Sequence, residues 1–117
     1  MSYDISFRVK VEGKPVYVDV IDGPNITWNV KELILHSSGW DIKNCDNNGP
    51  VSEWLKKIRM GINELSKHPE KYRKYEASNG WGTVEDTLRF YKECFDMYDE
   101  FMRYNEQLHD IAVVWVS

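Results

Sequence analysis

Cysteine and histidine are scarce in this sequence, and their positions argue against the disulfides and metal sites that often stabilise small domains. The two cysteines, Cys45 and Cys94, stand in unlike surroundings, one among Asn and Asp residues and the other in an apolar run. We therefore expect free thiols rather than a disulfide, which favours a reducing cytoplasm. The three histidines lie far apart, without paired cysteines or a His-Glu-x-x-His pattern. The sequence therefore predicts neither a metal site nor another cofactor.

Long apolar runs and an excess of positive charge are also missing. No stretch approaches the roughly 18 apolar residues of a transmembrane helix, and the residues after Met1 form no charged and apolar leader. We expect a protein that neither spans a membrane nor carries a standard secretion signal. Fifteen Lys and Arg residues against nineteen Asp and Glu residues give a net charge of −4. Because nucleic-acid binding needs a basic surface, no such role is expected.

Alternating residues near both ends of the chain predict a small sheet. Apolar and polar residues alternate over 3–11 and again over 16–20, with a Glu-Gly-Lys turn between them, which indicates a β-hairpin. The Asp-Gly-Pro sequence at 22–24 is expected to end the second strand. Residues 111–116 are apolar on both faces and rich in β-branched residues, so we expect a third strand beside the hairpin.

Helical periodicity occupies the middle of the chain. A short helix is expected after the N-cap Asn29, and Gly39 would close it in the left-handed conformation. Residues 41–49 carry several Asn and Asp and are interpreted as an irregular loop. A longer amphipathic helix is expected to begin at Pro50, in its first turn, and to end near His68.

A short basic piece precedes the longest helix. Residues 70–76 combine two tyrosines with Lys71, Arg73 and Lys74, which makes either a docking patch or a solvated helix. After a tight glycine-rich loop at 79–82, Thr83 and Asp86 resemble a capping box that begins the long helix.

The long helix carries more apolar surface than an ordinary surface helix needs. Two neighbouring stripes of apolar residues span about half of its circumference, against the roughly 100° that is usual. Either the other helices cover the extra stripe, or a second subunit does. The candidate residues for a homodimer interface are Phe90, Met97, Phe101 and Tyr104.

These elements predict one α+β domain over residues 1–117. We expect a two-layer arrangement, in which a small antiparallel or mixed sheet packs with one face on three to four helices. The sheet would consist of the N-terminal hairpin and the C-terminal strand.

Neither of the arrangements that catalysis commonly requires is visible. There is no nucleophile beside a base and no pair of carboxylates in unlike environments. Cys94 lies at helical spacing in an aromatic stripe, so we expect a buried structural thiol. His109 and Asp110 are neighbours whose side chains should point to different sides, leaving a solvated turn histidine. The sequence therefore predicts a protein that is not an enzyme.

Two segments combine tryptophan with amide and hydroxyl side chains. If they face one cleft, the indole rings would stack a planar ligand while the polar groups bind its edges. The alternative is that these polar groups only cap helices and turns. The candidate ligand-binding residues are Asn25, Thr27, Trp28, Asn29, Asn79, Trp81 and Thr83.

Some of these segments also carry a family resemblance. The opening Met-Ser-Tyr-Asp, the Asn-Ile-Thr-Trp-Asn segment at 25–29, the Trp-Gly-Thr helix start and the apolar C-terminal strand resemble a group of small phage and prophage proteins of unassigned function. The resemblance implies a bacterial or phage origin and a cytoplasmic accessory role. It assigns no reaction.

The sequence therefore supports two alternative functions. The first is an uncharacterised phage-type accessory protein that binds a host or phage protein, for example to blunt a defence system, and its acidic surface would suit a basic partner. The second is a sensor or sponge that binds a small molecule in the pocket formed by tryptophan and asparagine residues.

Overall fold

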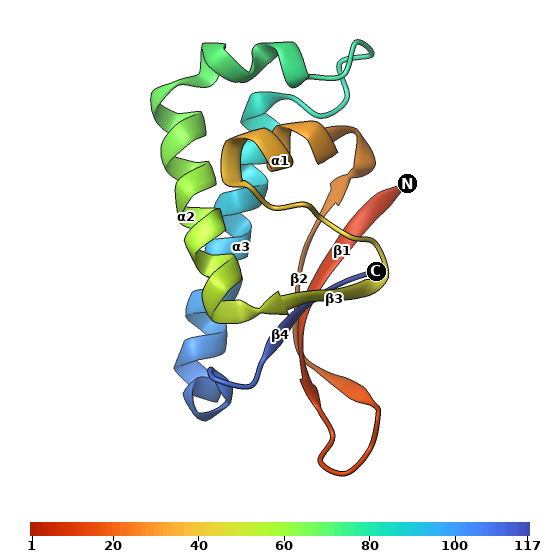
Figure 1. Ribbon diagram of the computed structural model, residues 1–117. Coiled ribbons are helices and arrows are strands. Elements are labelled where there is room, and N and C mark those ends of the chain that lie inside the picture. The colour runs from red at the N-terminus through yellow and green to blue at the C-terminus, as the bar shows by residue number, and fades with distance from the viewer.

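A computed structural model describes all 117 residues and contains one four-stranded antiparallel sheet (Figure 1). The strands lie in the order β2-β1-β4-β3. They are β1 (Ser2–Lys10), β2 (Tyr17–Thr27), β3 (Asp46–Pro50) and β4 (Val113–Val116). β1 and β2 form the hairpin, and β4 pairs with β1. The predicted α+β class and the position of the C-terminal strand are confirmed, although the sheet has four strands instead of three.

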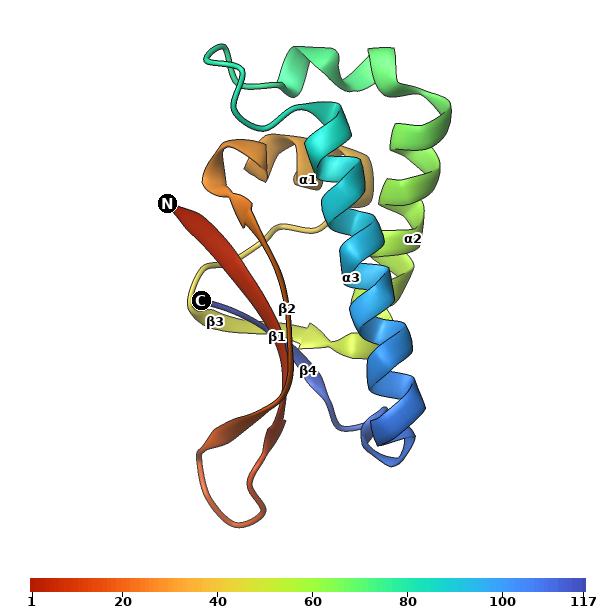
Figure 2. The same cartoon turned by 180° about the vertical axis from the view of Figure 1, so that it is seen from behind.

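The helices lie together against one face of the sheet. Figures 1 and 2 show α2 and α3 side by side along the sheet, with α1 across them near one end of the molecule. The helices are α1 (Lys31–Ser38), α2 (Val51–Lys67) and α3 (Val84–Asn105). Three 3-10 turns accompany them: η1 (Trp28–Val30), η2 (Pro69–Tyr75) and η3 (Glu106–Leu108).

β2 is longer than the sequence predicts. The expected stop at residues 22–24 is wrong, because pairing with β1 resumes at Asn25 and the intervening residues form a bulge. Gly23 lets the strand lie close to α3 at this bulge, since a Cβ there would overlap the Sδ atom of Met97 and would displace that side chain. The glycine therefore marks a close approach between strand and helix.

β3 lies in a segment that the sequence predicts as a loop. The prediction for 41–49 is wrong at its end, where the strand pairs with β4. The side chain of Asn48 supports this turn: its Oδ1 accepts from the indole Nε1 of Trp40 and from the backbone N of Lys43, both at 3.0 Å. Its Nδ2 donates to the carbonyl oxygens of Lys43 and Asp46. The hydrogen bonds of Asn48 therefore support a strand whose sequence lacks the usual alternation of apolar and polar residues.

The ends of the first two helices differ in how well the sequence predicts them. Gly39 ends α1 in the left-handed conformation at φ 76°, as predicted. The N-cap prediction for Asn29 is wrong, because Thr27 caps η1 first and accepts from the Asn29 backbone N at 3.5 Å. Pro50 lies just before α2 as the last residue of β3, not inside the first turn.

An aromatic cluster fills the space between the sheet and the helices. The ring of Phe7 meets those of Trp54 and Phe101 edge to face, with centroids 5.3 and 5.2 Å apart. The sheet and α2 thus cover the extra apolar stripe of α3. The thiol of Cys94 is also fully buried, as predicted, and burial raises its pKa.

The interface prediction is therefore wrong for three of its four residues. Phe90, Met97 and Phe101 are 2%, 4% and 0% exposed, so the chain itself buries them and leaves no surface for a partner. Tyr104 alone stays 67% exposed. The sequence periodicity locates the apolar stripe of α3 correctly, but it does not show that the sheet and α2 of the same chain cover this stripe.

Candidate binding site

Residues 77–83 form a projecting loop between η2 and α3, which we call the Trp81 loop. Figures 1 and 2 show it at one end of the molecule, beyond α1. The Trp81 side chain is 68% exposed. Its backbone N donates to the Oδ1 of Asn79 at 3.0 Å, an Asx turn that shapes the loop tip. Asn79 therefore serves the turn, while the indole extends toward solvent.

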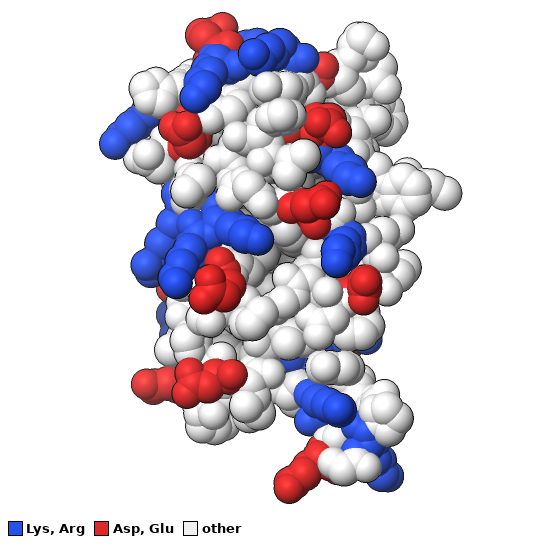
Figure 3. All heavy atoms as spheres, in the orientation of Figure 1, with Lys and Arg blue, Asp and Glu red and all other residues white.

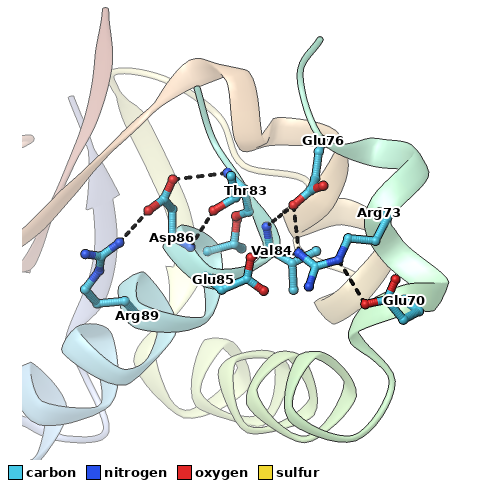
Figure 4. A network of polar contacts seen from close by, with 9 residues as sticks. Glu70, Arg73, Glu76, Thr83, Val84, Glu85, Asp86 and Arg89 are labelled. Carbon is cyan, nitrogen blue, oxygen red and sulfur yellow. Dashed lines mark hydrogen bonds and ion pairs between the residues drawn. The ribbon is translucent and has the colours of Figure 1, made fainter. Parts of the chain in front are cut away.

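The two ends of this loop are joined by charged side chains (Figure 4). The Oε2 of Glu76 accepts from the backbone N of Val84 at 2.8 Å and from the Nη1 of Arg73 at 3.1 Å. Arg73 also donates to Glu85 at 2.7 Å and to Glu70 at 3.3 Å. We call this group of contacts the loop clamp. It closes the base of the Trp81 loop by tying η2 to the first turn of α3.

The capping box predicted at the start of α3 is confirmed and adds to the clamp. The Oγ1 of Thr83 accepts from the backbone N of Asp86 at 3.1 Å, and the Oδ2 of Asp86 accepts from the backbone N of Thr83 at 3.2 Å. Arg89 forms an ion pair with the same Asp86 carboxylate. Thr83 thus uses its hydroxyl for the helix, as the capping interpretation expects.

The charges of the clamp stabilise one another. The hydrogen bond from Arg73 lowers the pKa of Glu85, and the three carboxylates around Arg73 raise its own pKa. The backbone N–H of Thr83 lowers the pKa of Asp86. Glu85 and Asp86 lie in the first turn of α3, where the helix dipole also favours negative charge. Arg73, Glu85 and Asp86 are therefore charged at neutral pH.

The Trp81 loop and the 25–29 segment meet through a glycine. Gly82 is buried at φ 92°, and a Cβ on it would lie 2.7 Å from the Cγ1 of Val30 and 3.4 Å from the Cβ of Asn29. Only glycine permits both this backbone conformation and this approach. The structure therefore brings the two predicted segments into contact. The backbone of Gly82 packs against the side chains of Val30 and Asn29, and the segments do not face each other across a cleft.

The predicted pocket lined by both tryptophans does not form. Trp28 is 39% exposed and packs its ring near that of Tyr3, with centroids 5.9 Å apart, while Trp81 points outward. Asn25 and Thr27 do line an open hollow of about 350 Å³ between β2 and α3. Its other lining residues are Ile26, Asp86, Arg89, Phe90 and Glu93, and neither indole is among them.

In the basic piece at 70–76 the two tyrosines pack onto the fold, while Lys71 and Lys74 stay exposed. Tyr72 is buried and donates its hydroxyl hydrogen to Glu64 at 2.7 Å. Burial, together with this hydrogen bond, raises the pKa of Tyr72 to about 12. The ring of Tyr75 stacks on His36 with centroids 4.0 Å apart.

Sequence reasoning missed Arg73 and Glu76 as the residues that hold the loop. Acidic residues three positions before and three positions after an arginine were the available signal, because such side chains meet on a helical turn. The contact between Arg73 and Glu85 had no local signal, since it joins residues 12 positions apart.

His109 is hydrogen-bonded on both sides, contrary to the prediction. Its Nε2 lies 3.1 Å from the hydroxyl of Tyr98, and its Nδ1 lies 3.3 Å from the Oδ1 of Asp110. The turn after η3 bends the backbone, so neighbouring side chains do not alternate as in a strand. The ring of His109 thus ties the approach to β4 onto α3.

No protein-family model matches the chain, and no curated protein or solved structure is significantly similar to it. No helix reaches the combination of length and apolar character that crossing a membrane requires. The Trp81 loop and its clamp are therefore the features that bear on the function.

Proposed function

We propose that this chain is a non-enzymatic binding module that docks onto another protein through Trp81. The observation that carries the proposal is a large indole, 68% exposed, on a loop whose base is closed by the bonds from Glu76 to Val84 and Arg73. Closing the loop beforehand reduces the conformational entropy lost on binding. Tryptophan is also among the residues that contribute most to protein interfaces.

The outward direction of Trp81 favours a protein over a small molecule. Small ligands bind in concave pockets that enclose most of their surface, whereas a projecting side chain fits into a pocket of its partner. The indole offers a large apolar face and one N–H donor. The matching surface is therefore an apolar pocket with a hydrogen-bond acceptor at its rim.

The resemblance to phage and prophage proteins supports a host or phage protein as the partner, and a component of a host defence system is one such protein. The two free cysteines support a cytoplasmic setting for this interaction, because thiols stay reduced there. The net charge of −4 favours a partner with a basic surface around its pocket.

Site-specific photo-crosslinking in the organism that encodes the chain tests this proposal. A photoreactive phenylalanine at position 81 should capture one protein, and the same group at position 60, where Met60 is 57% exposed on α2, should not. Purified wild-type chain should compete with this capture, and the Trp81→Ala variant should not.

Two outcomes would overturn the proposal. One is the same set of cross-linked proteins from both positions, which would indicate random encounters. The other is equal competition by the wild-type chain and by Trp81→Ala, which would show that the indole contributes nothing to binding. Capture of lipid instead of protein at position 81 would replace the proposal with membrane docking.

A further inference from the structure

The hairpin extends beyond the helices as an arm of two strands. Figures 1 and 2 show this arm, residues 9–18, projecting at the end of the molecule away from the Trp81 loop. Val9 pairs with Val18, and the backbone N of Val11 donates to the carbonyl oxygen of Val16 at 2.7 Å. The four valines therefore share one face of the arm. Val16 and Val18 are 48% and 45% exposed.

This valine face is the open end of the hydrophobic core. Val9 follows Phe7 by two residues on β1, so the two side chains lie on the same face of the sheet. Phe7 packs on Phe101 of α3, and Tyr104 continues the same helical stripe one turn later. Tyr104 and Ile111, at 67% and 60% exposed, remain uncovered. At this end of the molecule, β1 and α3 thus bear apolar side chains that neither element covers.

The arm and the end of α3 carry opposite charges. Lys10 and Lys14 outnumber the single acid of the arm, whereas the segment 99–111, which we call the foot, has an excess of acidic residues. Figure 3 shows Lys and Arg groups on the projecting arm and acidic groups at the lower left, where Figure 1 places the end of α3. Lys10, Lys14, Asp99 and Glu106 form no ion pair within the chain.

The geometry points to a second copy of this chain as the occupant of the open core end, with the arm of each copy seated on the foot of the other. A two-fold axis would make both contacts twice and would bring each valine face onto the partner's Tyr104 and Ile111. The charge of the arm complements that of the foot. A two-stranded ribbon is only marginally stable alone, so this cover would also order the arm.

This inference goes beyond the proposed function and does not depend on it. The arm and the Trp81 loop lie at opposite ends of the molecule (Figure 1), whose longest extent is 46 Å. A dimer joined through the arms therefore leaves both indoles free at its outer ends. Two docking loops on one particle would increase the avidity for a partner that has two sites.

Sedimentation of two charge-reversed variants tests the pairing directly. The arm variant Lys10→Glu, Lys14→Glu has an acidic arm and an acidic foot, and the foot variant Asp99→Lys, Glu106→Lys has both regions basic. Each variant alone should sediment as a monomer at concentrations where the wild-type chain is a dimer. A one-to-one mixture should restore a dimer, because each arm then faces a foot of opposite charge.

The apolar part of the interface is tested by one variant and a matched control. Val18→Asp should give a monomer with an unchanged circular dichroism spectrum, and Met60→Asp on the exposed side of α2 should stay a dimer. The inference is overturned by a wild-type chain that sediments as a monomer up to its solubility limit. It is equally overturned if the mixture of charge variants remains monomeric, or if Val18→Asp and Met60→Asp have equal effects.

Discussion

The aromatic core and the loop clamp are stabilised by different forces within one small chain. Around Phe7, Trp54 and Phe101, buried rings meet edge to face and no charge takes part. Around Arg73, by contrast, four side chains and a backbone N–H form a network of charged hydrogen bonds at the surface. Apolar packing supplies most of the stability of the fold, and the charged network mainly fixes the position of the Trp81 loop. The comparison therefore assigns folding to the core and the presentation of Trp81 to the clamp.

The free energy of unfolding should fall most when an aromatic ring is removed from the core. Trp54 is 2% exposed, and its replacement in Trp54→Ala leaves a cavity that the neighbouring rings only partly fill. We expect a loss of about 3–5 kcal/mol in the free energy of unfolding, measured by urea titration. A loss of about 0.5 kcal/mol or less, the size usual for exposed positions, would show that the buried rings are not the main source of stability.

Adding a methyl group to the packed core should lower the free energy of unfolding by the next largest amount. A Cβ at Gly61 would overlap the ring of Tyr91, whose hydroxyl bonds to Ser37 at 2.7 Å and so resists displacement. Gly61→Ala should cost about 1–3 kcal/mol despite the better helix propensity of alanine. The same urea titration of Met60→Ala, one position earlier and exposed, is the control and should change little. Stabilisation by Gly61→Ala would show that the ring is free to move.

Removing the cap of α3 should have a moderate effect. Thr83→Ala deletes the acceptor for the backbone N of Asp86, which should cost about 1 kcal/mol in thermal or urea unfolding. Thr83→Ser keeps the hydroxyl and should recover most of that loss. If the serine variant is as unstable as the alanine variant, the methyl group rather than the capping bond matters here.

Acid should weaken the clamp. Hydrogen bonds from Arg73 and from the Thr83 backbone lower the pKa values of Glu85 and Asp86 in the folded chain. These groups therefore stabilise the fold above their unfolded pKa values of about 4, and the stabilisation is lost as the pH falls through the lower folded values. The unfolding free energy should drop between about pH 5 and about pH 2. The drop should be smaller in the double variant Glu85→Gln, Asp86→Asn, and an equal drop would contradict this account.

The smallest expected effect comes from the exposed tryptophan. Trp81→Ala removes an indole that packs little, so the free energy of unfolding should change by about 0.5 kcal/mol or less. The same substitution at Trp54 is the matched comparison within one chain. A loss of several kcal/mol at Trp81 would mean that the indole is structural, and the proposed docking role would lose its basis.

Sequence patterns predicted those parts of the fold that depend on neighbouring residues. The alternation in the hairpin, the left-handed Gly39 and the capping box of Thr83 are local features, and all three are present. β3 was missed because its five residues, Asp-Asn-Asn-Gly-Pro, show no apolar alternation and depend on pairing with β4.

The candidate site was predicted only in part, for a similar reason. Trp81 and its glycine-rich loop are visible in the sequence, but the residues that hold the loop act across space. Glu76 and Val84 meet only after the chain has turned back, and the bond from Arg73 to Glu85 joins two different helical elements. The prediction of a pocket lined by Trp28 and Trp81 is wrong because the sequence does not show in which direction each indole points.

Hydrogen exchange at the base of the Trp81 loop shows whether the clamp holds the loop independently of the core. The amide of Val84 should be strongly protected in the wild-type chain, because it donates to Glu76 at 2.8 Å. In Glu76→Ala, which removes the acceptor, we predict that Val84 loses protection while the amide of Phe101 in the core keeps it. Rapid exchange of Val84 in the wild-type chain, or an equal loss at both amides in the variant, would contradict a clamp that acts separately from the core.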